Sequence, residues 1–144
     1  MAPNVLLRKL TYLRQLLADL APYENTTLDQ VLADHYKLER IFELLVVTAT
    51  DILNHKLAER DLTPDTYRDS YKLAAEQGLL PLDLAERLQD AASMRNLLVH
   101  FYERVHLSER VDYTILRDSI APALRDFSQF VALFEGQTND ENAL

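Results

Sequence analysis

Apolar residues recur at the spacing of an α-helix through most of this chain, and this periodicity constrains the fold more than any other feature. Near the N-terminus, leucines follow one another three or four residues apart from Leu6 to Leu20. A second stripe of this kind runs from Leu38 to Leu53. Only 2 of the 144 residues are glycine, and so few glycines favour long helices with short connections. The pattern predicts an all-α protein.

Start and stop signals divide the chain into four main helices plus one short helix, which we expect to form an antiparallel helical bundle. Thr26 and Asp29 have the spacing of a capping box for the second helix. Thr63 and Pro64 provide a cap and a first-turn proline for the short third helix, which Gly78 ends. The helices expected in chain order are 5–21, 28–59, 64–77, 81–101 and 112–134.

No linker rich in glycine, serine or proline divides the chain, so we expect a single helical domain over residues 1–136 and a flexible acidic tail at 137–144. The absence of cysteine excludes a disulfide framework and a thiolate metal site. Because neither a signal peptide nor a membrane-spanning apolar run is evident, we expect a cytoplasmic protein that does not bind membranes. The net charge of −8 argues against a broad nucleic-acid-binding surface, but it leaves room for a small basic site.

The most unusual segment is Arg95-Asn96-Leu97-Leu98-Val99-His100-Phe101-Tyr102, where functional side chains interrupt an otherwise apolar helix. Arginine, asparagine and histidine are costly to bury unless they are paired or used. Asn96 and His100 are four residues apart and share a helix face, whereas Arg95 and His100 are five apart and diverge on an ideal helix. For those two to meet, the arginine must reach, the helix must distort, or a second copy must face the first across a symmetric interface.

An arginine and a neutral histidine in one site are suited to cleaving RNA. Histidine transfers protons near neutral pH, guanidinium holds a phosphate, and the RNA's own 2′-OH serves as nucleophile, so neither metal nor cofactor is needed. Residue chemistry alone leaves an alternative open, in which Arg95 pairs with a carboxylate such as Asp51 and His100 is an ordinary buried residue. The histidines at positions 35, 55, 100 and 106 show no zinc-ligand spacing, so we expect no metal site.

The same segment resembles the Arg-x4-His-x-Tyr motif of the HepT-like ribonuclease toxins, a branch of the HEPN superfamily. The resemblance extends upstream through Tyr67-Arg68-Asp69, Gly78-Leu79-Leu80-Pro81 and Leu84-Ala85-Glu86-Arg87-Leu88, and Leu38-Glu39-Arg40 also fits the family in character. In all it covers roughly residues 5–135. It implies a HEPN-like bundle that forms a homodimer, with the motifs of the two copies facing each other across a composite active site.

The resemblance also implies the roles of individual residues. Arg95 and His100 match the catalytic pair of a metal-independent endoribonuclease that leaves a cyclic phosphate, and Asn96 matches the polar position that orients the histidine or the phosphate. Tyr102 matches the tyrosine to which the partner, an MNT-type nucleotidyltransferase antitoxin, adds AMP and so blocks the site. Residue chemistry, and not the resemblance, makes Asp51 and Arg104 candidates for support, the first by orienting a catalytic side chain and the second by holding RNA. The alternatives are a solvated or pairing carboxylate at Asp51 and an exposed loop residue at Arg104 that serves solubility.

Two functions from different classes therefore follow from the sequence. The first is the toxin of a type VII toxin–antitoxin system that cleaves RNA and is neutralised by AMP addition to Tyr102. The second is a non-catalytic helical binding module that docks a nucleotidyltransferase and presents substrate to it. An intact set of Arg95, His100 and Tyr102 favours the toxin, because a docking module has no need of these residues.

Overall fold

The computed structural model describes the backbone of residues 1–101 and 109–143, and the side chains of residues 1–94 and 113–137. Within these ranges the regular structure is helical, as the apolar periodicity predicts. The helices are α1 (Pro3–Leu20), the 3₁₀ turn η1 (Ala21–Tyr23), α2 (Leu28–Ala33), α3 (His35–Ala58), α4 (Tyr67–Glu76), α5 (Leu82–Phe101) and α6 (Glu109–Ala143). No helix in the described part of the chain is both long and apolar enough to cross a bilayer.

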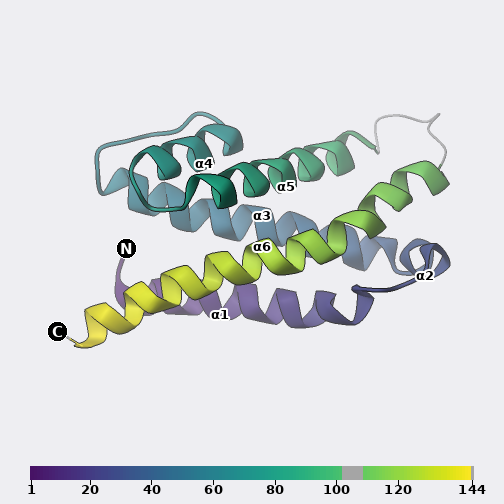
Figure 1. Ribbon diagram of the computed structural model, residues 1–144, viewed down its shortest axis with the longest axis horizontal. Helices are drawn as coiled ribbons and strands as arrows, with labels where there is room; N and C mark the ends of the chain where they lie inside the picture. The colour runs from purple at the N-terminus through teal and green to yellow at the C-terminus, as the bar shows by residue number, and fades with distance from the viewer. Residues whose placement is uncertain (102–108, 144) are drawn as a thin grey trace.

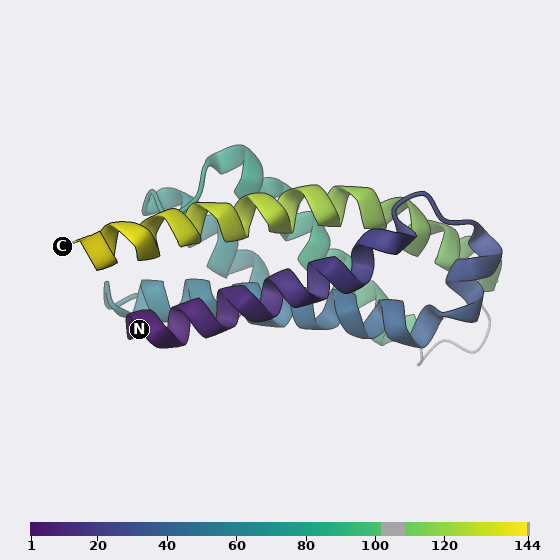
Figure 2. The same ribbon diagram turned by 90° about the horizontal axis from the view of Figure 1, so that it is seen from below.

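Four long helices, α1, α3, α5 and α6, form an antiparallel bundle, and α4 packs on the outside against α3 and α5 (Figure 1). The start of α1 and the end of α6 lie at one end of the bundle. The opposite end carries α2, the last turns of α5 and the first turns of α6, and the same arrangement is visible after a 90° turn (Figure 2). The segment predicted to be functional therefore lies near the end of the bundle that is remote from both termini.

The apolar stripes seen in the sequence form the core. Every leucine of the stripe from Leu6 to Leu20 that was expected to be buried is buried, and so is the stripe from Leu38 to Leu53. Phenylalanines of α6 complete the core from the other side, where the rings of Phe130 and Phe134 lie 4.7 Å apart. Burial of apolar surface of this kind is the main force that holds such helices together.

The expected single helix over residues 28–59 is wrong, because the chain breaks at Asp34 into α2 and α3. The carboxylate of Asp34 accepts hydrogen bonds from the Tyr23 hydroxyl at 2.7 Å and the Gln30 side-chain amide at 2.7 Å. These bonds, that from Tyr23 first, lower the pKa of Asp34. Asp34 has φ of −110° and ψ of 22°, outside the helical range, so the break lies at the residue whose side chain makes these two bonds.

Two caps also differ from the expectation. Helix α2 is capped by Thr27, which accepts from the Gln30 backbone N–H at 3.1 Å, and Thr26 has no such role. Helix α4 is capped by Thr66, which accepts from the Asp69 N–H at 3.1 Å, so the helix begins at Tyr67 rather than at residue 64. In both cases adjacent or nearby threonines offered the same cap, and only the path of the preceding chain decides which of them is used.

One of the two glycines ends a helix, and the other lies inside one. Gly78 has φ of 73° and ends α4 as expected, because residues with a side chain rarely adopt that backbone conformation. Gly136 does not end α6, which runs on to Ala143 instead of stopping at residue 134. A glycine inside a helix costs only about 1 kcal/mol, and a two-point ion pair from Arg14 to Glu135 holds this turn of α6 against α1. The flexibility of residues 137–144 stays a prediction.

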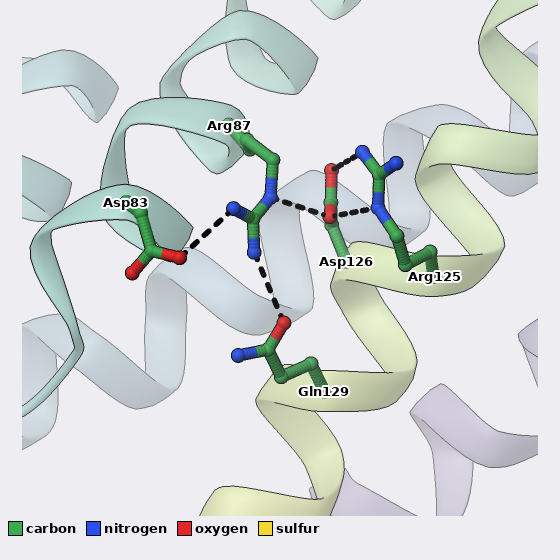
Figure 3. Close-up of polar contacts among 5 residues, drawn as sticks. All are labelled: Asp83, Arg87, Arg125, Asp126 and Gln129. Carbon is green, nitrogen blue, oxygen red and sulfur yellow. Dashed lines mark hydrogen bonds and ion pairs between the residues drawn. The ribbon is translucent and has the colours of Figure 1, made fainter.

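A polar network fixes α5 against α6 (Figure 3). Arg87 of α5 donates to the Asp126 carboxylate at 2.9 Å, and Arg125 donates to the same oxygen at 2.9 Å. The remaining guanidinium nitrogens of Arg87 reach Asp83 at 3.1 Å and Gln129 at 3.0 Å. The bond to Asp126, followed by that to Asp83, raises the pKa of Arg87, and Arg87 in turn lowers the pKa of Asp83. Because Asp126 is only 4% exposed, it depends on these donors.

Replacing Asp126 by alanine removes the group on which both arginines converge. We expect Asp126→Ala to lower the free energy of unfolding by about 1–2 kcal/mol in urea denaturation. The loss is modest because the side chains of Arg87 and Arg125 are 31% and 62% exposed and regain water. The matched control is Asp118→Ala on the same helix, whose side chain is 65% exposed. A loss from Asp126→Ala no greater than that of the control would contradict the role of the network.

Candidate functional site

Helix α5 carries the backbone of the predicted site. It runs without interruption from Leu82 to Phe101, so Arg95, Asn96 and His100 lie on its last two turns. The side chains of these three residues lie outside the described part of the chain, and so do Tyr102 and Arg104 entirely. The structure therefore gives the helical register of the first three positions, and the roles of all five residues stay predictions.

The register separates the predicted catalytic positions. Successive residues of an α-helix are turned by about 100°, so positions 95 and 100 are about 140° apart around α5. Positions 96 and 100 differ by only about 40° and share a face. Position 95 continues the stripe of Leu84 and Leu88, which are fully buried. Because α5 is not interrupted before Phe101, the helix itself does not bring positions 95 and 100 together.

Asp51 lies in a groove between α1 and α3, where Val5, Tyr12 and Val47 also line the surface. Its carboxylate forms an ion pair with Lys9 and lies 3.5 Å from His55 Nε2. These partners account for a carboxylate at this position without any catalytic role. A supporting role for Asp51 stays a prediction, since the side chains with which it was expected to act are not described.

A buried cluster of titratable groups, which the sequence did not reveal, joins the starts of α3 and α6. His35 Nδ1 lies 3.3 Å from a Glu39 carboxylate oxygen and 3.1 Å from the Tyr113 hydroxyl, which itself donates to Glu39 at 3.2 Å. Glu39 is 8% exposed and Tyr113 is 5% exposed. The spacing of four between His35 and Glu39 is a visible helical signal, but the third partner is far away in the sequence. The starts of α3 and α6 lie at the end of the bundle where α5 ends (Figure 1).

A metal site would need several ligating side chains close together. Among the described residues there is no group of three or more histidine, cysteine, aspartate or glutamate side chains placed to hold a metal ion. This statement does not extend to His100 and His106, whose side chains are not described.

Comparison with known proteins matches this chain to one protein family. The model of a family described as Ribonuclease HepT-like matches residues 6–133. A curated mRNA nuclease HepT from Shewanella oneidensis is 30% identical over 88 residues, which make up 60% of this chain and 62% of that protein. The matched segment thus spans less than two thirds of that relative's length.

Solved structures with the same fold come from toxin–antitoxin complexes. One contains a tri-AMPylated Shewanella oneidensis HEPN toxin in complex with MNT antitoxin, with a TM-score of 0.78, 20% identity and coverage of 94% of this chain and 99% of that one. A toxin–antitoxin structure with AMP-PNP has a TM-score of 0.75, 20% identity and coverage of 94% and 98%. These likenesses confirm the predicted HEPN-like all-α bundle. The match to the family model spans nearly the whole of that bundle, and the chain belongs to the HepT-like ribonuclease family.

Proposed function

We propose that the protein is the toxin of a toxin–antitoxin pair, a metal-independent endoribonuclease whose catalytic residues are Arg95 and His100. Membership of a ribonuclease family supports the reaction class. The observation that carries the assignment is the register of α5, which ends in two regular turns bearing an arginine, an asparagine and a histidine at positions 95, 96 and 100.

In the proposed reaction, His100 removes the proton from the RNA 2′-OH as that oxygen attacks the adjacent phosphorus. The bond to the 5′-oxygen of the next nucleotide breaks, that oxygen takes a proton from water and leaves as a 5′-OH, and a 2′,3′-cyclic phosphate remains on the upstream product. Arg95 holds the phosphate oxygens as negative charge builds on them. Asn96, about 40° from His100 around the helix, orients the imidazole or the phosphate. Arg104 would hold RNA beside this pair, and Asp51 would support the site by orienting one of its side chains.

The site is proposed to be shared between two copies of the chain. One straight helix directs positions 95 and 100 about 140° apart, which supports a site where a phosphate meets the arginine of one copy and the histidine of the other. A two-fold axis beside α5 brings the same helix of a second copy alongside it, and the proposal is that Arg95 of one copy and His100 of the other meet there. The homodimer is therefore part of the proposed mechanism and not an accessory to it.

The proposed partner is an MNT-type nucleotidyltransferase that inactivates the toxin by adding AMP to Tyr102. The support is a solved structure of the same fold, a tri-AMPylated HEPN toxin in complex with MNT antitoxin. Tyr102 is two residues from His100, so an added nucleotide brings phosphate charge next to the catalytic pair. That charge competes for Arg95 and repels the RNA backbone.

Replacing His100 tests the catalytic assignment. We expect the purified wild-type protein to cleave RNA in the presence of EDTA, with cyclic phosphate ends detected by mass spectrometry. His100→Ala should lose at least about 100-fold in rate, because it removes the proton acceptor. The matched control is His55→Ala, which removes a histidine whose side chain is 52% exposed and lies beside Asp51, and it should cleave like the wild type.

Cleavage by a folded His100→Ala protein at the wild-type rate would contradict the assignment. Failure of every form to cleave any RNA, together with a lasting complex with the nucleotidyltransferase, would favour the non-catalytic binding module. Circular dichroism of each variant separates loss of activity from loss of fold.

Replacing Tyr102 tests the proposed regulation. We expect co-expression with the nucleotidyltransferase to increase the intact mass of the wild-type toxin by one or more AMP units and to abolish RNA cleavage. Tyr102→Phe removes the acceptor hydroxyl, so this variant should keep its unmodified mass and continue to cleave RNA after co-expression. Modification of Tyr102→Phe to the same extent would show that AMP is attached elsewhere.

A further inference from the structure

Two cavities lie on opposite flanks of α5, upstream of the predicted catalytic positions. The first, about 340 Å³ in volume, is lined by Gln89 and Ser93 of α5 and by residues at the start of α4. The second, about 180 Å³, lies between α5 and α6 and is lined by Asp90 and Met94 among others. Either one is close enough along the helix to extend a site at positions 96 and 100.

The register of α5 distinguishes the two cavities. Positions 89, 93, 96 and 100 are spaced by four, three and four residues, which keeps them within about 60° of one another around the helix. Asn96 and His100 therefore occupy the continuation of the flank that lines the first cavity. Positions 90 and 94, which line the second, are turned toward α6. Position 96 follows Ser93 by only about 4.5 Å along the axis.

Charge favours the same cavity. The second cavity has three carboxylates in its wall, those of Asp90, Asp118 and Asp126, and two guanidiniums, those of Arg87 and Arg125. Both guanidiniums are already bound to Asp126, so the wall keeps a net negative charge that repels a phosphate backbone. The first has one carboxylate, that of Asp65, and one guanidinium, that of Arg68. The Arg68 side chain is exposed and makes no ion pair in the described part of the chain, so its charge is available to an anion.

The wall of the first cavity also has the chemistry of a nucleotide site. Ser70, only 1% exposed, donates to the Asn54 side-chain oxygen at 2.7 Å. This bond orients the Asn54 amide, whose nitrogen has no partner among the described residues. Gln89 and Ser93 add further neutral polar groups, and Tyr67 adds an aromatic side chain. Neutral donors and acceptors, an aromatic ring and one cation suit the ribose, base and phosphate of a single-stranded nucleotide.

We propose that this cavity, lined by Asn54, Tyr67, Arg68, Gln89 and Ser93, binds a nucleotide of the RNA substrate that flanks the scissile phosphate. The proposal rests on the proposed function, because the flanking position has meaning only if RNA is cleaved at His100. It adds a substrate-binding surface on α4 that belongs to the same copy as the adjoining turn of α5. In this arrangement Arg68 contacts a phosphate, and the amides of Asn54 and Gln89 contact the nucleotide.

The test compares Arg68→Gln and Gln89→Ala with the wild type in cleavage of a single-stranded RNA oligonucleotide. We expect each variant to raise KM by about fivefold and to leave kcat within about twofold, because the altered groups bind the substrate without touching the reacting atoms. In the uncleaving His100→Ala background, Arg68→Gln should also reduce the dependence of log Kd on log salt by roughly 0.7, the contribution of one phosphate contact on a single strand.

The matched control is Arg125→Gln, which removes the same charge from the wall of the other cavity and should leave KM and the salt dependence unchanged. One outcome is that the wild type cleaves RNA while Arg68→Gln and Gln89→Ala have the same KM and salt dependence as Arg125→Gln. In that case the proposed subsite is contradicted and the proposed function stands. If Arg68→Gln and Gln89→Ala bind RNA normally but no longer bind the nucleotidyltransferase, the cavity is a protein-docking site and the inference is overturned. If the wild type does not cleave RNA at all, both the proposed function and the subsite fall.

Discussion

The uninterrupted hydrogen bonding of α5 is the constraint on which the account of this protein depends. A straight helix turns each residue by about 100°, so an arginine and a histidine five positions apart face different neighbours. Position 95 follows the buried stripe, whereas position 100 lies on the flank with Gln89 and Ser93. For both residues to act on one phosphate, the Arg95 side chain must reach around the helix, or a second helix must supply one of the two residues, as proposed above. The proposed homodimer supplies such a second helix.

The packing around α5 explains how such a helix is held in place. Leucines on one side are buried, and Arg87 on another side meets the buried carboxylate of Asp126. Its remaining flank faces the start of α4, where the cavity is lined by neutral polar groups, one carboxylate and one cation. An acidic protein with a net charge of −8 can bind a polyanion only where carboxylates are locally scarce. The flank beside α4 meets that condition, and the flank beside α6 does not.

Sequence reasoning succeeded where a local pattern decides the structure and failed where distant residues decide it. The stripes from Leu6 to Leu20 and from Leu38 to Leu53 were predictable, because burial follows helical spacing. At the break, Asp34 is bonded to a hydroxyl eleven residues upstream, and the partner of Arg87 comes from another helix. The motif from Arg95 to Tyr102 stood out because polar residues in an apolar helix need a reason. Its shared use between two copies, for which resemblance and helical spacing both argue, stays a prediction.

The most direct test of the shared site is subunit complementation. Arg95→Ala and His100→Ala proteins, each inactive alone, are mixed under conditions that exchange subunits, and RNA cleavage is measured. If each site takes its arginine from one copy and its histidine from the other, mixed dimers contain one intact site. With random exchange, about a quarter of the wild-type activity should then return. Full exchange without any return of activity would show that both residues act from the same chain, and it would contradict the account.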